Sequence, residues 1–204
     1  MNNSTTSNFT DLEDVEDETT VSEIASKEIL SITMAELFSI EECEKINSTV
    51  IDELWMKTRV VGELDLHQAT RQKLRGETTS FPFEQIRDLT KEANSKIFDF
   101  SLLGIIDQDY PQIFKYEKGD YYKFHVEINP LSITRKLSFI INLSNSSEYT
   151  GGEIDFLNTS LENTISSTQG SILVFPSFLP YQITPVLSGT KKIIIGHIHG
   201  PEFK

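Results

Sequence analysis

From about residue 110 to residue 199, the sequence consists of short apolar segments that alternate with polar positions and are separated by Gly and Pro. A period of two is typical of β-strands that bury one face. Six or so such strands, following a helical region, predict an antiparallel β sandwich or barrel with helices packed against it. The segments are QIFKYEKGDYYKFHVEI, RKLSFIINLS, GGEIDFLN, SILVFPS, QITPVL and KKIIIGHIHG.

Helical patterns precede the strands. The residues SIEE, from Ser39 to Glu42, form a capping box and predict that a helix begins there. A second helix is expected from about residue 83 to residue 97, where apolar residues recur at helical spacing. The intervening residues 58–80 are polar and mixed, so we interpret them as a long loop that lines a pocket. In this loop, His67 and Arg71 are candidate substrate-contacting residues.

Charge limits the expected partners. The chain has 204 residues and a formal net charge of −13, and residues 11–18 alone contain six carboxylates. An acidic surface repels phosphate backbones, so we expect no nucleic-acid partner. No apolar run approaches the ~18–20 residues that cross a bilayer, so we expect no membrane partner. The expected partner is a small molecule or peptide, and the sequence leaves the oligomeric state open.

Composition also predicts the domain organisation. Residues 1–22 are polar and then acidic, and we expect them to form a disordered tail. Residues 23–204 are expected to form a single domain, with helices at about 39–98 and the barrel at about 110–201. The N-terminus lacks the basic start and apolar core of a secretory signal. A single cysteine, Cys43, excludes an intrachain disulfide and fits a cytoplasmic protein.

The strand segment FHVEI places His125 and Glu127 two positions apart. On a β-strand, side chains with this spacing point to the same face. A neutral imidazole and a carboxylate suit a divalent first-row metal, and two histidines with one carboxylate form the ligand set of non-haem Fe(II) oxygenases. The pair therefore predicts part of a metal site and leaves its third ligand to be found.

The flanking residues resemble a known family. YEKGDYYKFH, from Tyr116 to His125, followed by Glu127, resembles the Y-x-x-G-x-x-Y-x-x-H-x-D motif of the prolyl-4-hydroxylase-like 2-oxoglutarate/Fe(II) dioxygenases. RKLSFIINLSNSSEYTGGEIDF (135–156) and GSILVFPSFLPYQITPVLSGTKKIIIGHIHGP (170–201) resemble its later motifs in the same order. The resemblance implies a mainly β protein with N-terminal helices and a double-stranded β-helix (jelly-roll) core. It also implies Fe(II), with 2-oxoglutarate as co-substrate, at the mouth of the barrel.

Three positions depart from the family pattern. Glu127 replaces an aspartate and keeps the same type of oxygen ligand. Tyr181 stands where the family has its distal histidine, so one imidazole ligand is missing. Lys191 replaces the arginine that, in the family, binds the far carboxylate of 2-oxoglutarate. Lysine keeps the charge and loses the bidentate fork, which predicts weakened or absent co-substrate binding.

Two residues are candidates for the third metal ligand. Strand alternation puts His197 on the same face as Lys191, at the position of a family tryptophan that the resemblance places near the metal. One alternative is that His197 completes the site with His125 and Glu127, with Tyr181 as a further ligand or hydrogen-bond donor. Another is that Tyr181 or water completes it. Alternatively, His197 is a pocket imidazole hydrogen-bonded to the core. We expect the nearby His199 to be exposed at the strand end.

The resemblance also assigns co-substrate positions beside Lys191. Tyr116 and Tyr122 align with family tyrosines near 2-oxoglutarate, and Asn142 and Ser138 share one face of a strand close to it. The alternative for each is an aromatic core residue or a hydrogen-bonded polar group within the barrel.

The sequence therefore predicts an oxidoreductase that hydroxylates or otherwise oxidises an amino acid, peptide or small metabolite. One alternative is a pseudoenzyme or binding protein on the same fold. Another is a catalyst that works without 2-oxoglutarate and uses His197, Tyr181 and Glu127 as acid–base groups.

Overall fold

The computed structural model describes residues 33–58, 66–157 and 168–203. The expected acidic tail, residues 1–22, lies outside these ranges, and the assignment of residues 23–204 to one domain stays a prediction. The helical elements are η1 (Asp52–Leu54), α2 (Ile40–Asn47), α3 (Phe83–Ala93), the π-helical turn η2 (Asn94–Phe98) and η3 (Asp107–Asp109). The strands are β1 (Thr33–Glu36), β2 (Met56–Lys57), β3 (His67–Gln68), β4 (Thr70–Lys73), β5 (Gln112–Tyr116), β6 (Tyr121–His125), β7 (Arg135–Asn142), β8 (Tyr149–Gly151), β9 (Ile154–Phe156), β10 (Ser171–Pro176), β11 (Tyr181–Ile183), β12 (Val186–Gly189) and β13 (Lys191–His199).

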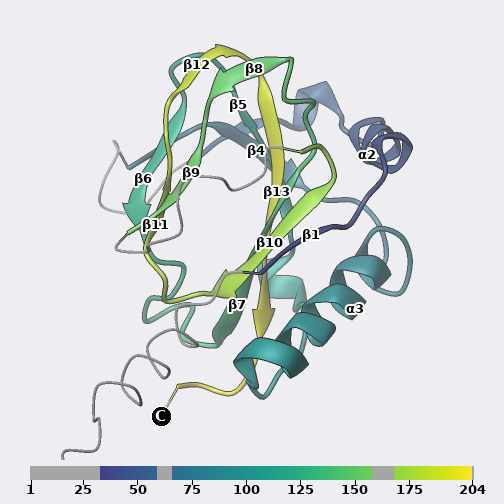
Figure 1. Cartoon of the computed structure of the whole chain (residues 1–204), viewed down its shortest axis with the longest axis vertical. Coiled ribbons are helices and arrows are strands. Elements are labelled where there is room, and N and C mark those ends of the chain that lie inside the picture. The colour runs from purple at the N-terminus through teal and green to yellow at the C-terminus, as the bar shows by residue number, and fades with distance from the viewer. Residues whose placement is uncertain (1–32, 59–65, 158–167, 204) are drawn as a thin grey trace, which may run out of the picture.

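The strands form two main antiparallel sheets. The major sheet has the order β1-β10-β7-β13-β5-β4-β2, and the minor sheet has the order β3-β6-β11-β9. Strands β12 and β8 form a separate short pair. Figure 1 shows β6, β9 and β11 on one side of the major sheet and helices α2 and α3 on the other side. This is the expected double-stranded β-helix with helices packed on its outer face.

Strand alternation divides the core into two clusters. Ile193 and Ile195 of β13 belong to the cluster between the two sheets. Ile194 and Ile198 belong to the cluster beneath the helices. The side chains of β13 therefore alternate between the barrel interior and the helical layer, as the sequence predicts. Because Lys191 and His197 share the parity of the first pair, they lie on the interior face.

Local signals explain how the helices begin. Ser39 is the N-cap of α2, and its hydroxyl accepts a hydrogen bond from the backbone N–H of Glu42 at 3.2 Å. The Glu42 carboxylate in return accepts from the backbone N–H of Ser39 at 2.9 Å, which confirms the capping box. The second expected helix is also present as α3, and its last turn, η2, is π-helical.

Residues 58–80 are not simply a loop. Residues 59–65 lie outside the described ranges, but residues 67–68 and 70–73 form β3 and β4, which extend the two sheets. The period-two pattern was hidden because two of the buried residues on these strands, His67 and Gln72, are polar. Strand β1 was not expected either, and it pairs with β10 at the edge of the major sheet.

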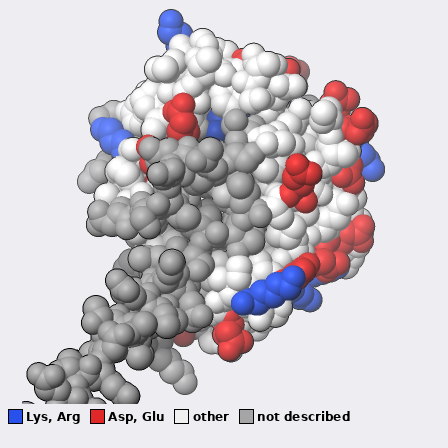
Figure 2. Space-filling model, in the orientation of Figure 1, with Lys and Arg blue, Asp and Glu red and all other residues white. Residues whose placement is uncertain are grey.

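Acidic side chains are spread over the face drawn in Figure 2, where Lys and Arg form no continuous patch. This distribution agrees with the net charge of −13. Within the ranges that the structure describes, no helix is both long and apolar enough to cross a membrane.

Candidate metal and co-substrate site

His125 and Glu127, which we call the HxE pair, lie where β6 ends. His125 is the last residue of β6, and its register partner on β11 is Tyr181. Glu127 follows the strand, and its backbone N–H donates to the carbonyl of Ser177 at 3.0 Å. These contacts bring an imidazole, a carboxylate and a phenol together at one end of the barrel.

His125 and Glu127 meet through two atoms that both carry lone pairs. Nδ1 of His125 lies 2.8 Å from the carbonyl oxygen of Lys123, which can only accept, so Nδ1 carries a proton. Nε2 of a neutral His125 is then an acceptor, yet it lies 3.2 Å from Oε1 of Glu127. This contact is favourable only when a proton or a metal ion supplies positive charge between the two atoms.

The ring of His125 is fixed in place by stacking. Tyr122 lies parallel to it, with ring centroids 3.4 Å apart and planes inclined by 13°. His67 stacks on the other face of Tyr122 at 3.7 Å and 4°, which continues the stack toward β3. Oriented rings of this kind are expected around a metal-binding imidazole, because outer contacts set the direction of the ligand atom.

Tyr181 completes a convergent set of donors. Its hydroxyl donates to Oε1 of Glu127 at 2.7 Å, which is the oxygen that also faces His125. Tyr181 is fully buried. Burial, together with the neighbouring Glu127 carboxylate, raises the pKa of Tyr181 well above its ordinary value, so the phenol is protonated at neutral pH.

The second oxygen of Glu127 is held by Arg135, the first residue of β7. Arg135 Nη1 lies 2.9 Å from Oε2 of Glu127 and 2.9 Å from its backbone oxygen. Arg135 also forms a bidentate ion pair with Asp109, at 2.6 and 2.8 Å. Although burial raises the pKa of Glu127, the surrounding His197, His125 and Arg135 hold it below its usual range. Glu127 is therefore an ionised carboxylate with one anchored oxygen.

Sequence reasoning missed Arg135 and Asp109 as parts of this site. Arg135 stood in the RKLS motif without an assigned role, and Asp109 precedes the strands with no distinguishing pattern. The expectation that His199 is exposed was wrong, since this residue is only 3% exposed. Its Nε2 lies 3.0 Å from Asp109 Oδ2 and its Nδ1 lies 2.9 Å from the Thr134 hydroxyl. Cross-strand pairing of His199 with Arg135 explains this burial.

His197 points into the same region but approaches the other oxygen. Its Nε2 lies 3.6 Å from Oε2 of Glu127, the oxygen bound by Arg135. Its Nδ1 lies 3.1 Å from the Ser138 hydroxyl, which in turn contacts the Ser177 hydroxyl at 2.9 Å. Burial lowers the pKa of His197 to about 4, so the ring is neutral at pH 7.

The relocated metal site of His125, Glu127 and His197 is not assembled. Across residues 33–58, 66–157 and 168–203, no group of three or more His, Cys, Asp or Glu side chains has the arrangement of a metal site. The reason lies in the carboxylate, because His125 faces Oε1 of Glu127 whereas His197 faces Oε2. His197 fits its alternative interpretation, a pocket imidazole bonded to a core hydroxyl.

The expected co-substrate residues are divided among several contacts. Lys191 is 4% exposed, and its ammonium donates to the carbonyl of Gly152 at 2.6 Å. No carboxylate in the described ranges pairs with it, and burial lowers its pKa to about 8. The Tyr116 hydroxyl lies 2.9 Å from His67 Nε2. Asn142 exchanges hydrogen bonds with the backbone of Ser144, so its amide braces the turn that follows β7.

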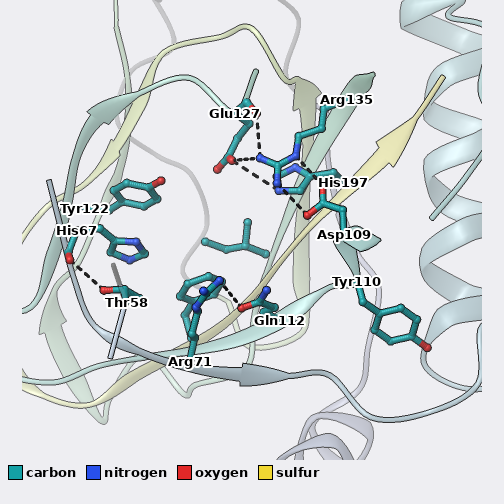
Figure 3. A pocket seen from close by; sticks show the side chains of 12 residues that line it. Thr58, His67, Arg71, Asp109, Tyr110, Gln112, Tyr122, Glu127, Arg135 and His197 are labelled. Carbon is teal, nitrogen blue, oxygen red and sulfur yellow. Dashed lines mark hydrogen bonds and ion pairs between the residues drawn. The ribbon is translucent and has the colours of Figure 1, made fainter. Parts of the chain in front are cut away.

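A cavity of about 170 Å³ adjoins Glu127. Figure 3 shows Glu127, Arg135 and His197 on one side of it and Arg71 with Gln112 on another. His67 and Arg71 both line this cavity, as do Tyr122 and Thr58, whereas Lys191 does not. The two residues that we expected to contact substrate therefore share one cavity next to the HxE pair.

The donor chemistry fits a metal ion. The carboxylate oxygen Oε1 of Glu127 lies 3.2 Å from the imidazole nitrogen Nε2 of His125 and 2.7 Å from the phenol oxygen of Tyr181. Ligand bonds of about 2.1 Å at right angles place ligand atoms about 3 Å apart, so both distances suit a shared cation. The set His125, Glu127 and Tyr181 differs from two histidines and a carboxylate in one ligand.

Comparisons with known proteins identify the family of this chain. A family model described as the 2OG-Fe(II) oxygenase superfamily matches residues 111–199. A PKHD-type hydroxylase of Synechococcus sp. (strain CC9902) is 31% identical over 173 residues, which cover 80% of this chain and 75% of that protein. A PKHD-type hydroxylase of Idiomarina loihiensis is 32% identical over 87 residues, which cover 42% of this chain and 40% of that protein.

Solved structures share the fold. The prolyl-4-hydroxylase of Pseudomonas putida superposes with a TM-score of 0.63 at 16% identity, covering 89% of this chain and 97% of that chain. A prolyl hydroxylase of Trichoplax adhaerens, solved with a peptide fragment of the hypoxia inducible factor oxygen degradation domain, has a TM-score of 0.67 at 12% identity. That alignment covers 91% of this chain and 94% of the Trichoplax chain.

The motif order, the jelly-roll core and the sequence relatives agree, and the cofactors that the family implies are Fe(II) and 2-oxoglutarate. This chain belongs to the 2OG-Fe(II) oxygenase superfamily of oxidoreductases, and its fold is prolyl-4-hydroxylase-like.

Proposed function

We propose that this protein is a 2-oxoglutarate/Fe(II)-dependent oxygenase with an atypical metal site, in which His125 and Glu127 bind the metal and Tyr181 is the third protein ligand. The observation that carries this proposal is the facing pair His125 Nε2 and Glu127 Oε1, 3.2 Å apart, with the opposite ring nitrogen already protonated. A divalent cation between these two atoms would turn an unfavourable contact into two ligand bonds.

The surrounding residues would orient these ligands. The Lys123 carbonyl and the Tyr122 ring fix the plane of His125, and the Arg135 guanidinium fixes one oxygen of Glu127. The other oxygen is thereby directed toward His125 and Tyr181. Such outer contacts matter because a ligand that is already oriented loses less conformational freedom when the metal binds.

Lys191 is our candidate for the far carboxylate of 2-oxoglutarate. The buried ammonium of Lys191 donates to a backbone carbonyl and lies 5.2 Å from the centroid of the Tyr149 ring, but it has no carboxylate partner among the described residues. An incoming carboxylate would supply the missing negative charge.

We propose that Tyr116 and Tyr122 line the 2-oxoglutarate site between Lys191 and the metal. Ser138 and Asn142 would form the polar walls of this site. When bound, Fe(II) and 2-oxoglutarate supply the oxidising chemistry of the family.

Two observations bear on the substrate class. The Trichoplax relative was solved with a peptide fragment, and a cavity of about 170 Å³ beside Glu127 holds a single side chain or a small metabolite. We propose oxidation, with hydroxylation as the usual outcome, of an amino acid, peptide or small metabolite. The cytoplasm is the proposed compartment.

One observation favours the alternative, a binding protein on the same fold. Arg135 already supplies a positive charge 2.9 Å from Glu127, and Tyr181 occupies the other oxygen of this carboxylate. In that case the network is complete without metal, and the proton at His125 Nε2 takes the place of the cation. The acid–base alternative draws on the same contacts, since Tyr181 and Glu127 are within hydrogen-bond distance.

Anaerobic titration with Fe(II) and 2-oxoglutarate tests the proposal. We expect a visible metal-to-ligand charge-transfer band that saturates at one Fe(II) per chain. Absence of the band, together with metal-free purified protein, would eliminate the oxygenase in favour of the binding protein.

A matched pair of variants assigns the ligands. His125→Gln removes a proposed ligand and should abolish the band. Lys118→Gln, a surface change in the turn between β5 and β6, should leave the band unchanged. Equal bands in both variants would remove His125 from the site.

A further inference from the structure

The cavity beside Glu127 contains four charged side chains, and they are not equally compensated. Three of them form one chain of ion pairs, in which Arg135 bridges Asp109 at 2.6 Å and Glu127 at 2.9 Å. The fourth is Arg71 of β4. No carboxylate within the described ranges forms an ion pair with Arg71, although acidic residues lie nearby on the cavity wall.

The hydrogen bonds of Arg71 leave most of its donors unused. Nη1 donates to Oε1 of Gln112 at 2.9 Å, which fixes the plane of the guanidinium against β5. Nε is buried and has no hydrogen-bond partner among the described residues. A guanidinium carries five N–H donors in a rigid fork that matches a carboxylate. Arg71 is therefore an oriented cation with donors to spare on the wall of a polar cavity.

We propose that Arg71 binds the carboxylate of a small monoanionic substrate, which lies in this cavity with its reactive carbon toward Glu127. This inference rests on the proposed function and adds the substrate class to it. Figure 3 shows Arg71 and Gln112 on the opposite side of the view from Glu127, so a substrate that spans the cavity touches both. A bidentate carboxylate would satisfy the donors that Gln112 leaves open.

Charge and volume restrict the anion. Asp109 and Glu127 line the same cavity and repel a second negative charge, so one carboxylate is favoured over a phosphate dianion. A volume of about 170 Å³ equals the share of roughly five or six water molecules, which a compound of a few carbon atoms fills. Lys191 does not line the cavity, so this carboxylate site is separate from the one proposed for 2-oxoglutarate.

Pentanoate and its neutral analogue pentanamide test the inference on the purified full-length chain by calorimetry. We expect pentanoate to bind at least about tenfold more tightly than pentanamide, as expected for a charge-assisted hydrogen bond. Arg71→Gln should lower the pentanoate affinity by at least about tenfold. Arg71→Lys, which keeps the charge and loses the fork, should give an intermediate affinity.

Equal affinity for pentanoate and pentanamide in the unaltered protein would overturn the inference, whatever the stability of the variants. So would an Arg71→Gln variant that binds pentanoate as the original does. Lys191→Met tests the other buried cation that could bind a carboxylate. If only this variant loses pentanoate binding, the anion binds at Lys191 and the proposal is refuted.

Metal binding separates this inference from the proposed function. Fe(II) titration of Arg71→Gln should match that of the unaltered protein, because Arg71 contacts none of the proposed ligands. If the unaltered protein binds pentanoate through Arg71 but binds no Fe(II), the oxygenase fails and the carboxylate site stands. If Fe(II) binds and pentanoate does not, only the substrate class is refuted.

Discussion

Arg135 donates two hydrogen bonds to Glu127 from its Nη1 atom, one to the side-chain Oε2 and one to the backbone carbonyl, each at 2.9 Å. The remaining nitrogens bind Asp109, so one guanidinium connects two carboxylates on the wall of the cavity. Because Arg135 holds Oε2, the other side-chain oxygen of Glu127, Oε1, is the one that faces His125 and Tyr181. The proposed metal site therefore depends on a residue that is not a ligand.

We therefore expect Arg135→Gln to weaken Mn(II) or Fe(II) binding by about 10–100-fold, the usual effect of losing an outer contact of a metal ligand. The variant should also lose about 3–5 kcal/mol of unfolding free energy, because two partly buried carboxylates lose their partner. Urea unfolding and metal titration measure the two effects. Arg135→Lys, tested alongside, should recover stability more than metal affinity, because charge returns without the fork. Unchanged metal binding in both variants would contradict the positioning role.

The third ligand can be decided by two substitutions. Tyr181→Phe removes the phenol oxygen beside Oε1 of Glu127 and should lower metal affinity by at least about tenfold. His197→Ala should leave metal affinity within about twofold, because its Nε2 faces the oxygen that Arg135 holds. The reverse pattern would restore the relocated site that the sequence suggested. Metal titration monitored by calorimetry distinguishes the outcomes.

Restoring the family ligand gives a gain-of-function test. Tyr181→His combined with Lys191→Arg recreates two histidines, a carboxylate and a guanidinium at the family positions. We expect iron-dependent turnover of 2-oxoglutarate to rise above that of the unaltered protein, measured as succinate formed. A rise from zero would identify the natural chain as a pseudoenzyme, whereas a rise from a finite rate would support the atypical oxygenase.

His67 should make the protein sensitive to acid. Burial lowers the pKa of His67 to about 3, against an ordinary value of 6.5. Between these two values the unfolded chain binds a proton that the folded chain excludes, so stability falls as pH falls from 6.5 toward 3. The expected loss is on the order of 5 kcal/mol. His67→Phe keeps the ring on Tyr122 and should flatten the acid side of a plot of unfolding free energy against pH, relative to the unaltered protein.

Lys191 should produce a pH dependence of the same sign in the alkaline range. Burial lowers its pKa to about 8, below an ordinary value of 10.5, so charging this group costs folding free energy. Stability is reduced below pH 8 and recovers as pH rises from 8 to 10.5, by about 3 kcal/mol. Lys191→Met should be more stable than the unaltered protein at pH 7, and the difference should shrink at pH 10. Bound 2-oxoglutarate should remove part of the difference, since a carboxylate compensates the ammonium.

Much of the fold was predictable because it depends on local periodicity. Period-two alternation predicted that Ile193 and Ile195 share one face of β13, and the structure places them in one core cluster and Ile194 and Ile198 in the other. The capping box of α2 was equally local. Strands β3 and β4 escaped prediction because polar His67 and Gln72 occupy two of their buried positions, which only neighbouring strands can make favourable.

By itself, the sequence determined the family, the pair His125 and Glu127 and the absence of a histidine at position 181, because these are consecutive or aligned residues. Only the tertiary structure decided which oxygen of Glu127 meets which partner. His197 and His199 lie two positions apart on one strand, yet one contacts Ser138 and the other Asp109. Such choices depend on angles and distances between segments far apart in the chain. Periodicity places a side chain on a face, but packing decides which atoms it meets.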